Sequence, residues 1–83
     1  MPVIAVVEGM LVMIYFKDHG PPHFHVEFGE FQARISIATL SVMDGTLPIA
    51  KRRKLLEWAK DHQDQLAQAW QDVQRERKPR RIK

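Results

Sequence analysis

The sequence predicts an α+β domain of two layers, in which an antiparallel four-stranded meander carries one long or broken C-terminal helix on one face. Two observations lead to this fold class. Residues 3–37 consist of β-branched and aromatic runs separated by glycine-containing turns, which is typical of short antiparallel strands. From residue 48 the apolar residues instead recur at every third or fourth position, the spacing of a helix with one buried face. A chain of 83 residues has room for one such domain with a modest core.

The turns of the predicted meander set which residues face each other. Its four strands are Val3–Val7, Met10–Lys17, His23–Phe28 and Phe31–Ile37. Gly29-Glu30 fits a two-residue hairpin turn, which places His25 opposite Arg34. If residues 18–22 form the preceding loop, Tyr15 lies beside His25 and Lys17 lies beside His23. The predicted result is a row of Tyr15, His25 and Arg34 across three strands.

The helical segment begins near Pro48, because proline favours the first turn of a helix, and continues to Gln74. Its apolar stripe consists of Leu55, Ala59, His62, Leu66, Ala69 and Val73. An unbroken helix of this length would measure about 40 Å, whereas four strands make a sheet only about 19 Å wide. We therefore expect either a break near Asp61-His62 or an overhanging second half that offers Trp70 and Val73 to another chain.

Three of the four histidines lie between His19 and His25, where Pro21-Pro22 leads into the third strand. Side chains alternate along a strand, so His23 and His25 share one face. Neutral imidazole can remove a hydroxyl proton, Arg and Lys stabilise phosphate charge, and Tyr or a second His can protonate a leaving oxygen. This combination suits metal-independent RNA cleavage, with His25 as the base. The candidate catalytic residues are His25, His23, Arg34, Tyr15 and Lys17.

The histidine pair has two other interpretations. His23 and His25 are close enough to share one metal ion, but Glu27 lies roughly 13 Å from His23 along the strand, so the third ligand would be His19 or come from another chain. With no cysteine and only this pair, we expect no metal and no other cofactor. In the remaining interpretation the histidines belong to a polar outer face of a non-catalytic module.

The net charge of +3 is concentrated at the C-terminus. Residues 75–83 hold six Lys or Arg and one Glu, whereas residues 1–74 hold 7 basic and 9 acidic residues. We expect residues 1–74 to form the single α+β domain and residues 75–83 to be a basic, mobile tail. The candidates for contacts with RNA or another anion are Lys51, Arg52, Arg53, Arg80 and Arg81.

Absences in the composition exclude several classes of protein. There is no cysteine, which excludes disulfide-stapled folds, thiolate zinc sites and thiol nucleophiles. No apolar run approaches the roughly 18 residues of a membrane span, and the first residues lack the pattern of a signal peptide. We expect a cytoplasmic protein that does not bind membranes.

The first two strands carry apolar residues on both faces, so something must cover the outer one. We expect the cover to be the return segment 38–45, the end of the helix, or a partner chain. The candidate partner-binding residues are Trp70, Val73, Leu11 and Met13. A homodimer would also cover such a surface.

Four stretches of the sequence together match the motifs of a known family: Tyr15–Val26, Ile35–Leu40, Gly45–Pro48 and Leu56–Ala59. The first of them contains Asp18-His19-Gly20-Pro21-Pro22-His23-Phe24-His25. In these stretches the sequence resembles the bacterial family catalogued as domain of unknown function 4160. No activity is established for that family, and its members are often encoded beside a second small protein in gene pairs that look like toxin–antitoxin modules. The resemblance therefore implies a small cognate protein as a partner and favours the hypothesis of an RNase toxin.

We therefore interpret the protein as a component of a toxin–antitoxin-like gene pair that binds a small cognate protein. Its catalytic form would be a ribonuclease that acts through the His, Arg and Tyr side chains of the sheet face. The alternatives are a non-catalytic binding or transcription-regulatory module, and a His-x-His metal-binding protein.

Overall fold

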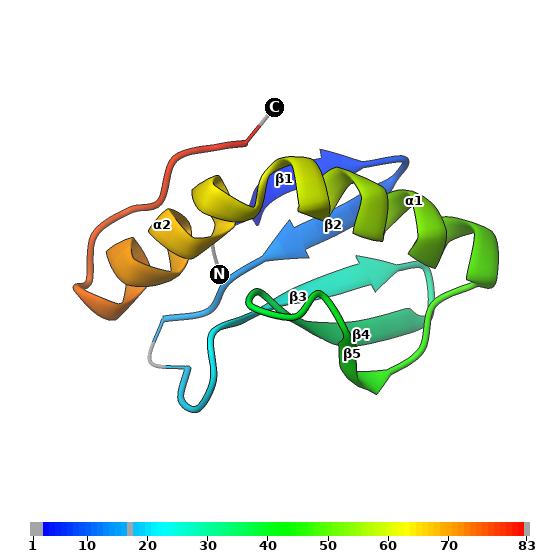
Figure 1. Cartoon of the computed structure of the whole chain (residues 1–83), viewed down its shortest axis with the longest axis horizontal. Coiled ribbons are helices and arrows are strands. Elements are labelled where there is room, and N and C mark those ends of the chain that lie inside the picture. The colour runs from blue at the N-terminus through cyan, green and yellow to red at the C-terminus, as the bar shows by residue number, and fades with distance from the viewer. Residues whose placement is uncertain (1–2, 17, 83) are drawn as a thin grey trace.

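The computed structural model describes residues 3–16 and 18–82, and within them an antiparallel sheet carries two helices across one face (Figure 1). The sheet has five strands in sequence order: β1 (Val3–Val7), β2 (Met10–Met13), β3 (His23–Phe28), β4 (Phe31–Ser36) and β5 (Val42–Gly45). The helices are α1 (Ile49–Asp61) and α2 (Gln63–Gln74). The predicted α+β class and antiparallel meander are confirmed, but with five strands instead of four and two helices instead of one.

The core lies between the sheet and the two helices. Phe24 and Val26 of β3 are at most 1% exposed, and Ile35 of β4 is fully buried beside them. Leu55 of α1 and Leu66 of α2 close the core from the helical side and are also fully buried. The apolar stripe that the sequence predicts is therefore the face that packs on the sheet.

The β3–β4 hairpin has the predicted register at every paired position, from His23–Ser36 to Phe28–Phe31. Gly29 in the turn has φ +57°, a conformation that glycine adopts without steric cost and other residues rarely adopt. His25 therefore lies opposite Arg34, as expected.

The connection between β2 and β3 differs from the prediction by two residues. Met13, rather than Tyr15, lies opposite His25, because β2 ends at Met13 and a longer connection over residues 14–22 follows. A shift of two residues keeps every side chain on its predicted face. Tyr15 still contacts His25, with 4.2 Å between the ring centroids. Lys17 lies outside the described residues.

The additional strand, β5, lies in segment 38–45, which was one of the three alternatives that we gave for the cover of the outer sheet face. It pairs with β4 through Ile35–Val42 and Arg34–Asp44, and a bulge interrupts the ladder between these pairs. Gly45 ends the strand with φ +82°, and a Cβ there would collide with the backbone of Gln32. Only glycine fits this close approach, so the chain can turn from the sheet edge into α1.

His62 separates the two helices, one of the two outcomes expected at this position. Its side-chain Nδ1–H donates to the Trp58 carbonyl at 2.7 Å, and this carbonyl is the acceptor that a continuous helix would give to the His62 backbone N–H. That N–H instead donates to the Ala59 carbonyl at 3.1 Å, which ends α1 in a tighter turn. Within the described chain, neither helix is both long and apolar enough to cross a membrane.

The basic C-terminal segment runs back along α2 toward β1 (Figure 1). Ile82 is 6% exposed and belongs to the hydrophobic core, and its N–H donates to the Ile4 carbonyl at 2.7 Å. Pro79 is also buried. The segment that we expected to be a tail outside the domain therefore ends against β1.

Candidate functional site

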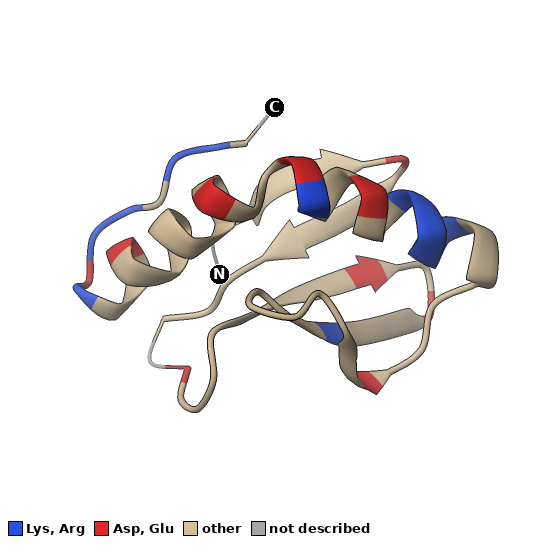
Figure 2. Cartoon of the chain, viewed as in Figure 1, with Lys and Arg blue, Asp and Glu red and all other residues tan. Residues whose placement is uncertain are grey.

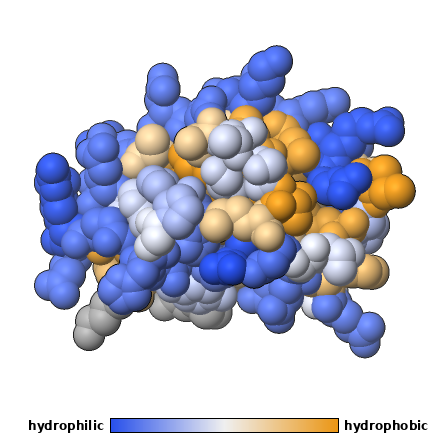
Figure 3. Space-filling view, turned by 60° about the horizontal axis from the view of Figure 1, so that its bottom comes forward, coloured by the Kyte–Doolittle hydropathy of each residue, from blue (hydrophilic) through white to orange (hydrophobic). Residues whose placement is uncertain are grey.

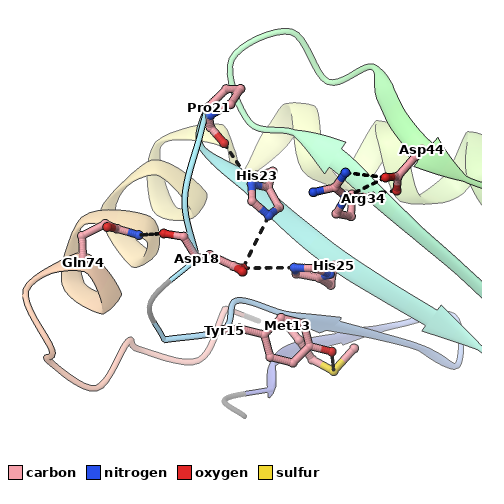
Figure 4. Close-up of polar contacts among 9 residues, drawn as sticks. All are labelled: Met13, Tyr15, Asp18, Pro21, His23, His25, Arg34, Asp44 and Gln74. Carbon is pink, nitrogen blue, oxygen red and sulfur yellow. Dashed lines mark hydrogen bonds and ion pairs between the residues drawn. The ribbon is translucent and has the colours of Figure 1, made fainter.

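Three side chains meet where the β2–β3 connection enters β3: Asp18, His23 and His25 (Figure 4). Oδ2 of Asp18 lies 3.0 Å from Nε2 of His25 and 3.4 Å from Nε2 of His23. The three candidate ligand atoms all lie within 4.8 Å of one another. We refer to these residues as the Asp–His–His cluster.

His23 is the buried member of the cluster. Its side chain is 2% exposed, and Trp70 of α2 packs on it with 5.2 Å between the ring centroids. Nδ1 lies 2.9 Å from the Pro21 carbonyl oxygen, which can only accept, so Nδ1 carries a proton and donates it. In the neutral ring Nε2 then has an unprotonated lone pair, and it finds no hydrogen-bond partner in the described chain. A buried acceptor therefore faces the carboxylate of Asp18.

This burial corrects the role that the sequence analysis gave to His23. Strand alternation does put His23 on the same side as His25, but the second helix covers the start of β3, and Nε2 of His23 is fully buried. A buried nitrogen cannot touch a substrate. His23 therefore cannot serve as the surface acid of the predicted RNase site.

His25 is the accessible histidine of the cluster, with 22% of its side chain exposed. Its Nε2 is hydrogen-bonded to Asp18, and the Tyr15 ring lies against it edge to face. Burial lowers the pKa of His25 from its ordinary value and outweighs the opposing effect of the Asp18 carboxylate. This shift favours the neutral ring, which is the form that binds a metal ion or removes a proton.

Asp18 is the member that the sequence analysis missed. It lies in the β2–β3 connection, and α2 holds it there, since the Gln74 side-chain amide donates to the Asp18 backbone carbonyl at 3.0 Å. The signal that could have found it is a carboxylate placed five residues before a His-x-His pair. His19, which we named as one of two possible sources of a third metal ligand, the other being another chain, is exposed and is not part of the cluster.

A groove of about 310 Å³ runs along the outer face of the sheet beside the cluster. Tyr15, His25 and Arg34 all line it, so the predicted row does share one surface. Arg34, however, is held by Asp44, with its Nε 3.0 and 2.9 Å from the two carboxylate oxygens and a further bond from Nη2. The hydrogen bond from Arg34 lowers the pKa of the Asp44 carboxyl. The charge of Arg34 is therefore already matched, and Glu27 adds a second carboxylate to the groove.

The five cations expected to contact anions lie away from this groove, in two separate places (Figure 2). Lys51 is engaged within the chain, because its Nζ donates to the Glu8 carbonyl at 2.8 Å and lies 4.9 Å from the centroid of the Phe28 ring. The other four are exposed: Arg52 and Arg53 on α1, and Arg80 and Arg81 on the C-terminal segment.

Three of the four residues expected to bind a partner are buried within this chain. Met13 is fully buried, Val73 is 1% exposed and Trp70 is 8% exposed. Leu11 is 39% exposed and pairs across the β1–β2 ladder with Val6, which is 55% exposed. Figure 3 shows apolar residues gathered among polar ones on the side of the molecule below the view of Figure 1.

The donor set of the cluster fits a first-row divalent metal ion. Two imidazoles and one carboxylate are the ligands of many catalytic zinc sites and of non-haem iron sites. Metal–ligand bonds of about 2.0–2.1 Å place neighbouring ligand atoms about 2.8–3.4 Å apart, from octahedral to tetrahedral geometry. The two distances from Asp18, 3.0 and 3.4 Å, lie in this range. The Pro21 carbonyl supplies the outer contact that fixes which nitrogen of His23 can bind the ion.

Comparison with known proteins identifies a family, but the description of that family states no activity. A family model described as a domain of unknown function (DUF4160) matches residues 9–71, a stretch that includes the whole cluster. No curated protein and no solved structure matches the chain.

Proposed function

The chain belongs to the DUF4160 family, and because the description of that family states no activity, we propose a function from the geometry of the Asp–His–His cluster. The domain binds one divalent transition-metal ion through Asp18, His23 and His25. The ion borders the groove on the outer sheet face, where it serves hydrolytic chemistry. This proposal replaces our expectation of a metal-independent site.

The observation that carries the proposal is the lone pair on Nε2 of His23. A buried acceptor without a donor costs about 1–3 kcal/mol, and here another acceptor, Oδ2 of Asp18, lies 3.4 Å from it. A cation between the two atoms satisfies both. A second proton on His23 is the competing explanation, and it predicts a different response to substitution of Asp18.

The ligand types narrow the class of ion. Imidazole nitrogens favour zinc, iron, cobalt or nickel over calcium and magnesium, which prefer sets of oxygen ligands. A carboxylate and two imidazoles leave at least one coordination position for water or substrate. Asp18 and His25, whose side chains are 23% and 22% exposed, give solvent access to that position.

An open position beside a groove supports hydrolysis. A metal-bound water loses a proton near neutral pH and becomes a nucleophile. This favours a metal-dependent form of the phosphodiester cleavage that we expected, since His23 is buried and Arg34 is paired with Asp44. Tyr15, edge-on to His25, is the side chain positioned to contact a substrate at that position.

A cobalt titration tests the proposal. Metal-free protein made without an affinity tag should develop visible Co²⁺ absorption that saturates at about one ion per chain. His23→Gln should lose this binding, while His19→Gln, which also removes one imidazole from the same loop region, should keep it. Equal binding by both variants, or no saturable binding by the unchanged protein, would refute the site.

A second proposal concerns a partner and rests on a different observation. Val6 and Leu11 form an adjacent exposed apolar pair on β1 and β2, the one part of the expected partner surface that the chain leaves open. We propose that a small cognate protein, the second member of a toxin–antitoxin-like pair, covers it. Val6→Asp should abolish co-purification with the product of the adjacent gene and leave metal binding unchanged, whereas unchanged co-purification would exclude this surface.

A further inference from the structure

A second groove lies between α2 and the C-terminal segment, and its volume is about 650 Å³. Gln65 and Gln68 line one wall, and Arg77, Arg80 and Arg81 line the other. Helical spacing puts Gln65 and Gln68 on the side of α2 opposite to Trp70 and Gln74, which contact the Asp–His–His cluster. We infer that this basic groove binds the phosphate backbone of single-stranded RNA.

The cations of the groove are held in place rather than carried on a free tail. Arg80 and Arg81 are exposed but lie between two buried residues, Pro79 and Ile82. The Ile82 N–H bonds the Ile4 carbonyl at 2.7 Å, which fixes the far end of the segment against β1. A backbone fixed on both sides of two guanidinium groups loses less entropy when they bind an anion.

The charge of the groove is unbalanced. Asp72 is the carboxylate among its lining residues, and it pairs with Arg77 at 3.2 Å. Arg80 and Arg81 make no ion pair with any other described residue. Two guanidinium groups therefore remain available for an anionic ligand, and their planar donors match the oxygens of a phosphate.

The surface of the groove favours a nucleic acid over an acidic protein. Protein interfaces have an apolar centre, but the apolar lining here is limited to Ala69 and the buried Ile82. The opposite wall offers the amides of Gln65 and Gln68. Among the described lining residues the one aromatic ring is the imidazole of His62, which is already stacked on Trp58, so we expect binding mainly through the backbone with little sequence preference.

This inference goes beyond the proposed metal site and does not depend on it. The groove and the cluster share only α2, so RNA binding should persist in metal-free protein and in His23→Gln. If the metal proposal fails, the inference that the basic groove binds RNA still stands. If the RNA inference fails, the metal proposal still stands.

Salt-dependent binding of a fluorescein-labelled 15-nucleotide oligouridine, followed by anisotropy, tests the inference. The slope of log K against log salt should fall in magnitude by about 1.4 in Arg80→Gln/Arg81→Gln, which corresponds to about 25-fold weaker binding at 0.1 M salt. Arg52→Gln/Arg53→Gln is the matched control, since it removes the same charge from exposed residues of α1. The control should bind within about twofold of the unchanged protein, because its cations lie outside the groove.

A third variant tests whether RNA lies between the two walls of the groove or contacts the C-terminal segment alone. Gln65→Glu adds a carboxylate to the helical wall and leaves the C-terminal segment unchanged, so it should weaken binding several-fold if RNA lies between the two walls. Three results would overturn the inference: equal losses in both double variants, unchanged binding in Gln65→Glu, or tighter binding of poly-glutamate than of oligouridine at equal charge. Far-UV circular dichroism of each variant confirms that these exposed substitutions leave the fold intact.

Discussion

The polar groups on the two sides of α2 differ in their exposure to solvent. Toward β3 the helix presents Trp70, which packs on the buried ring of His23, and Gln74, whose amide donates to the Asp18 backbone carbonyl. Toward the C-terminal segment it presents Gln65 and Gln68 to cations that remain in water. One helix thus borders a buried imidazole nitrogen that lacks solvent and a groove where charged groups remain solvated.

The difference determines how large each effect should be. Electrostatic interactions strengthen where water is excluded, whereas exposed charges are screened by salt over about 8 Å at physiological ionic strength. Single substitutions in the cluster should therefore remove a function outright. Substitutions in the basic groove should reduce binding in steps that depend on salt, as the paired arginine variants test.

The largest effect is expected for Asp18→Asn. In metal-free protein the new amide can donate to Nε2 of His23, so the free energy of unfolding should stay the same or rise. Free zinc at about 100 times its dissociation constant should add about 2.7 kcal/mol to the unchanged protein and nothing to the variant. Urea denaturation with chelator and with zinc measures both quantities.

The same experiment distinguishes between two explanations of the contact between Asp18 and His23, a bound metal ion and a second proton on His23. If a charged imidazolium paired with Asp18, the amide would leave a buried charge alone. Metal-free Asp18→Asn would then lose about 3–5 kcal/mol. A loss of that size would contradict the metal site.

A smaller effect is expected at the residue that positions Asp18. Gln74→Ala removes the amide that holds the Asp18 backbone carbonyl, and outer contacts of this kind alter metal affinity by about tenfold. Gln71→Ala, an exposed glutamine in the same part of α2, is the matched control and should not change the affinity. Competition with a chromophoric chelator gives the dissociation constants, and equal values for the two variants would remove the positioning role.

Tryptophan fluorescence can report which side of α2 the ion occupies. Trp70 contacts His23, whereas Trp58 stacks on His62 at the helix break with 4.9 Å between the centroids. Bound Co²⁺ should therefore quench Trp58→Phe strongly and Trp70→Phe weakly. The opposite ranking would place the ion away from the cluster.

The smallest effect is expected for Arg34→Gln. The Arg34–Asp44 pair is exposed, so its loss should leave the midpoint of urea denaturation nearly unchanged. Metal affinity should also stay the same, because Arg34 is not among the three ligands. A large fall in the midpoint of urea denaturation or in metal affinity would mean that the groove and the cluster form one cooperative unit.

How accurately the sequence predicts the pairing of two strands depends on the length of the connection between them. Gly29-Glu30 allows a single hairpin register, so every β3–β4 pair could be predicted. The longer connection over residues 14–22 is set by tertiary contacts such as Gln74 with Asp18, which no local pattern encodes. The prediction was therefore wrong by two residues there, and Asp18 was missed.

Burial was harder to predict than strand face. Alternation correctly puts His23 and His25 on one side of β3, but it contains no information about a helix that begins forty residues later along the chain. Once His62 breaks the helix, Trp70 reaches the ring of His23. The contrast between a buried and an accessible imidazole, on which the proposed metal site depends, arises from that packing.

The metal content of protein made without an affinity tag tests the central claim most directly. After dialysis against metal-free buffer and addition of one equivalent each of zinc, iron, cobalt and nickel, the unchanged chain should retain about one ion through gel filtration, and His23→Gln should retain none. Elemental analysis that finds no retained metal in the unchanged chain, or the same amount in both proteins, would contradict a site built from Asp18, His23 and His25.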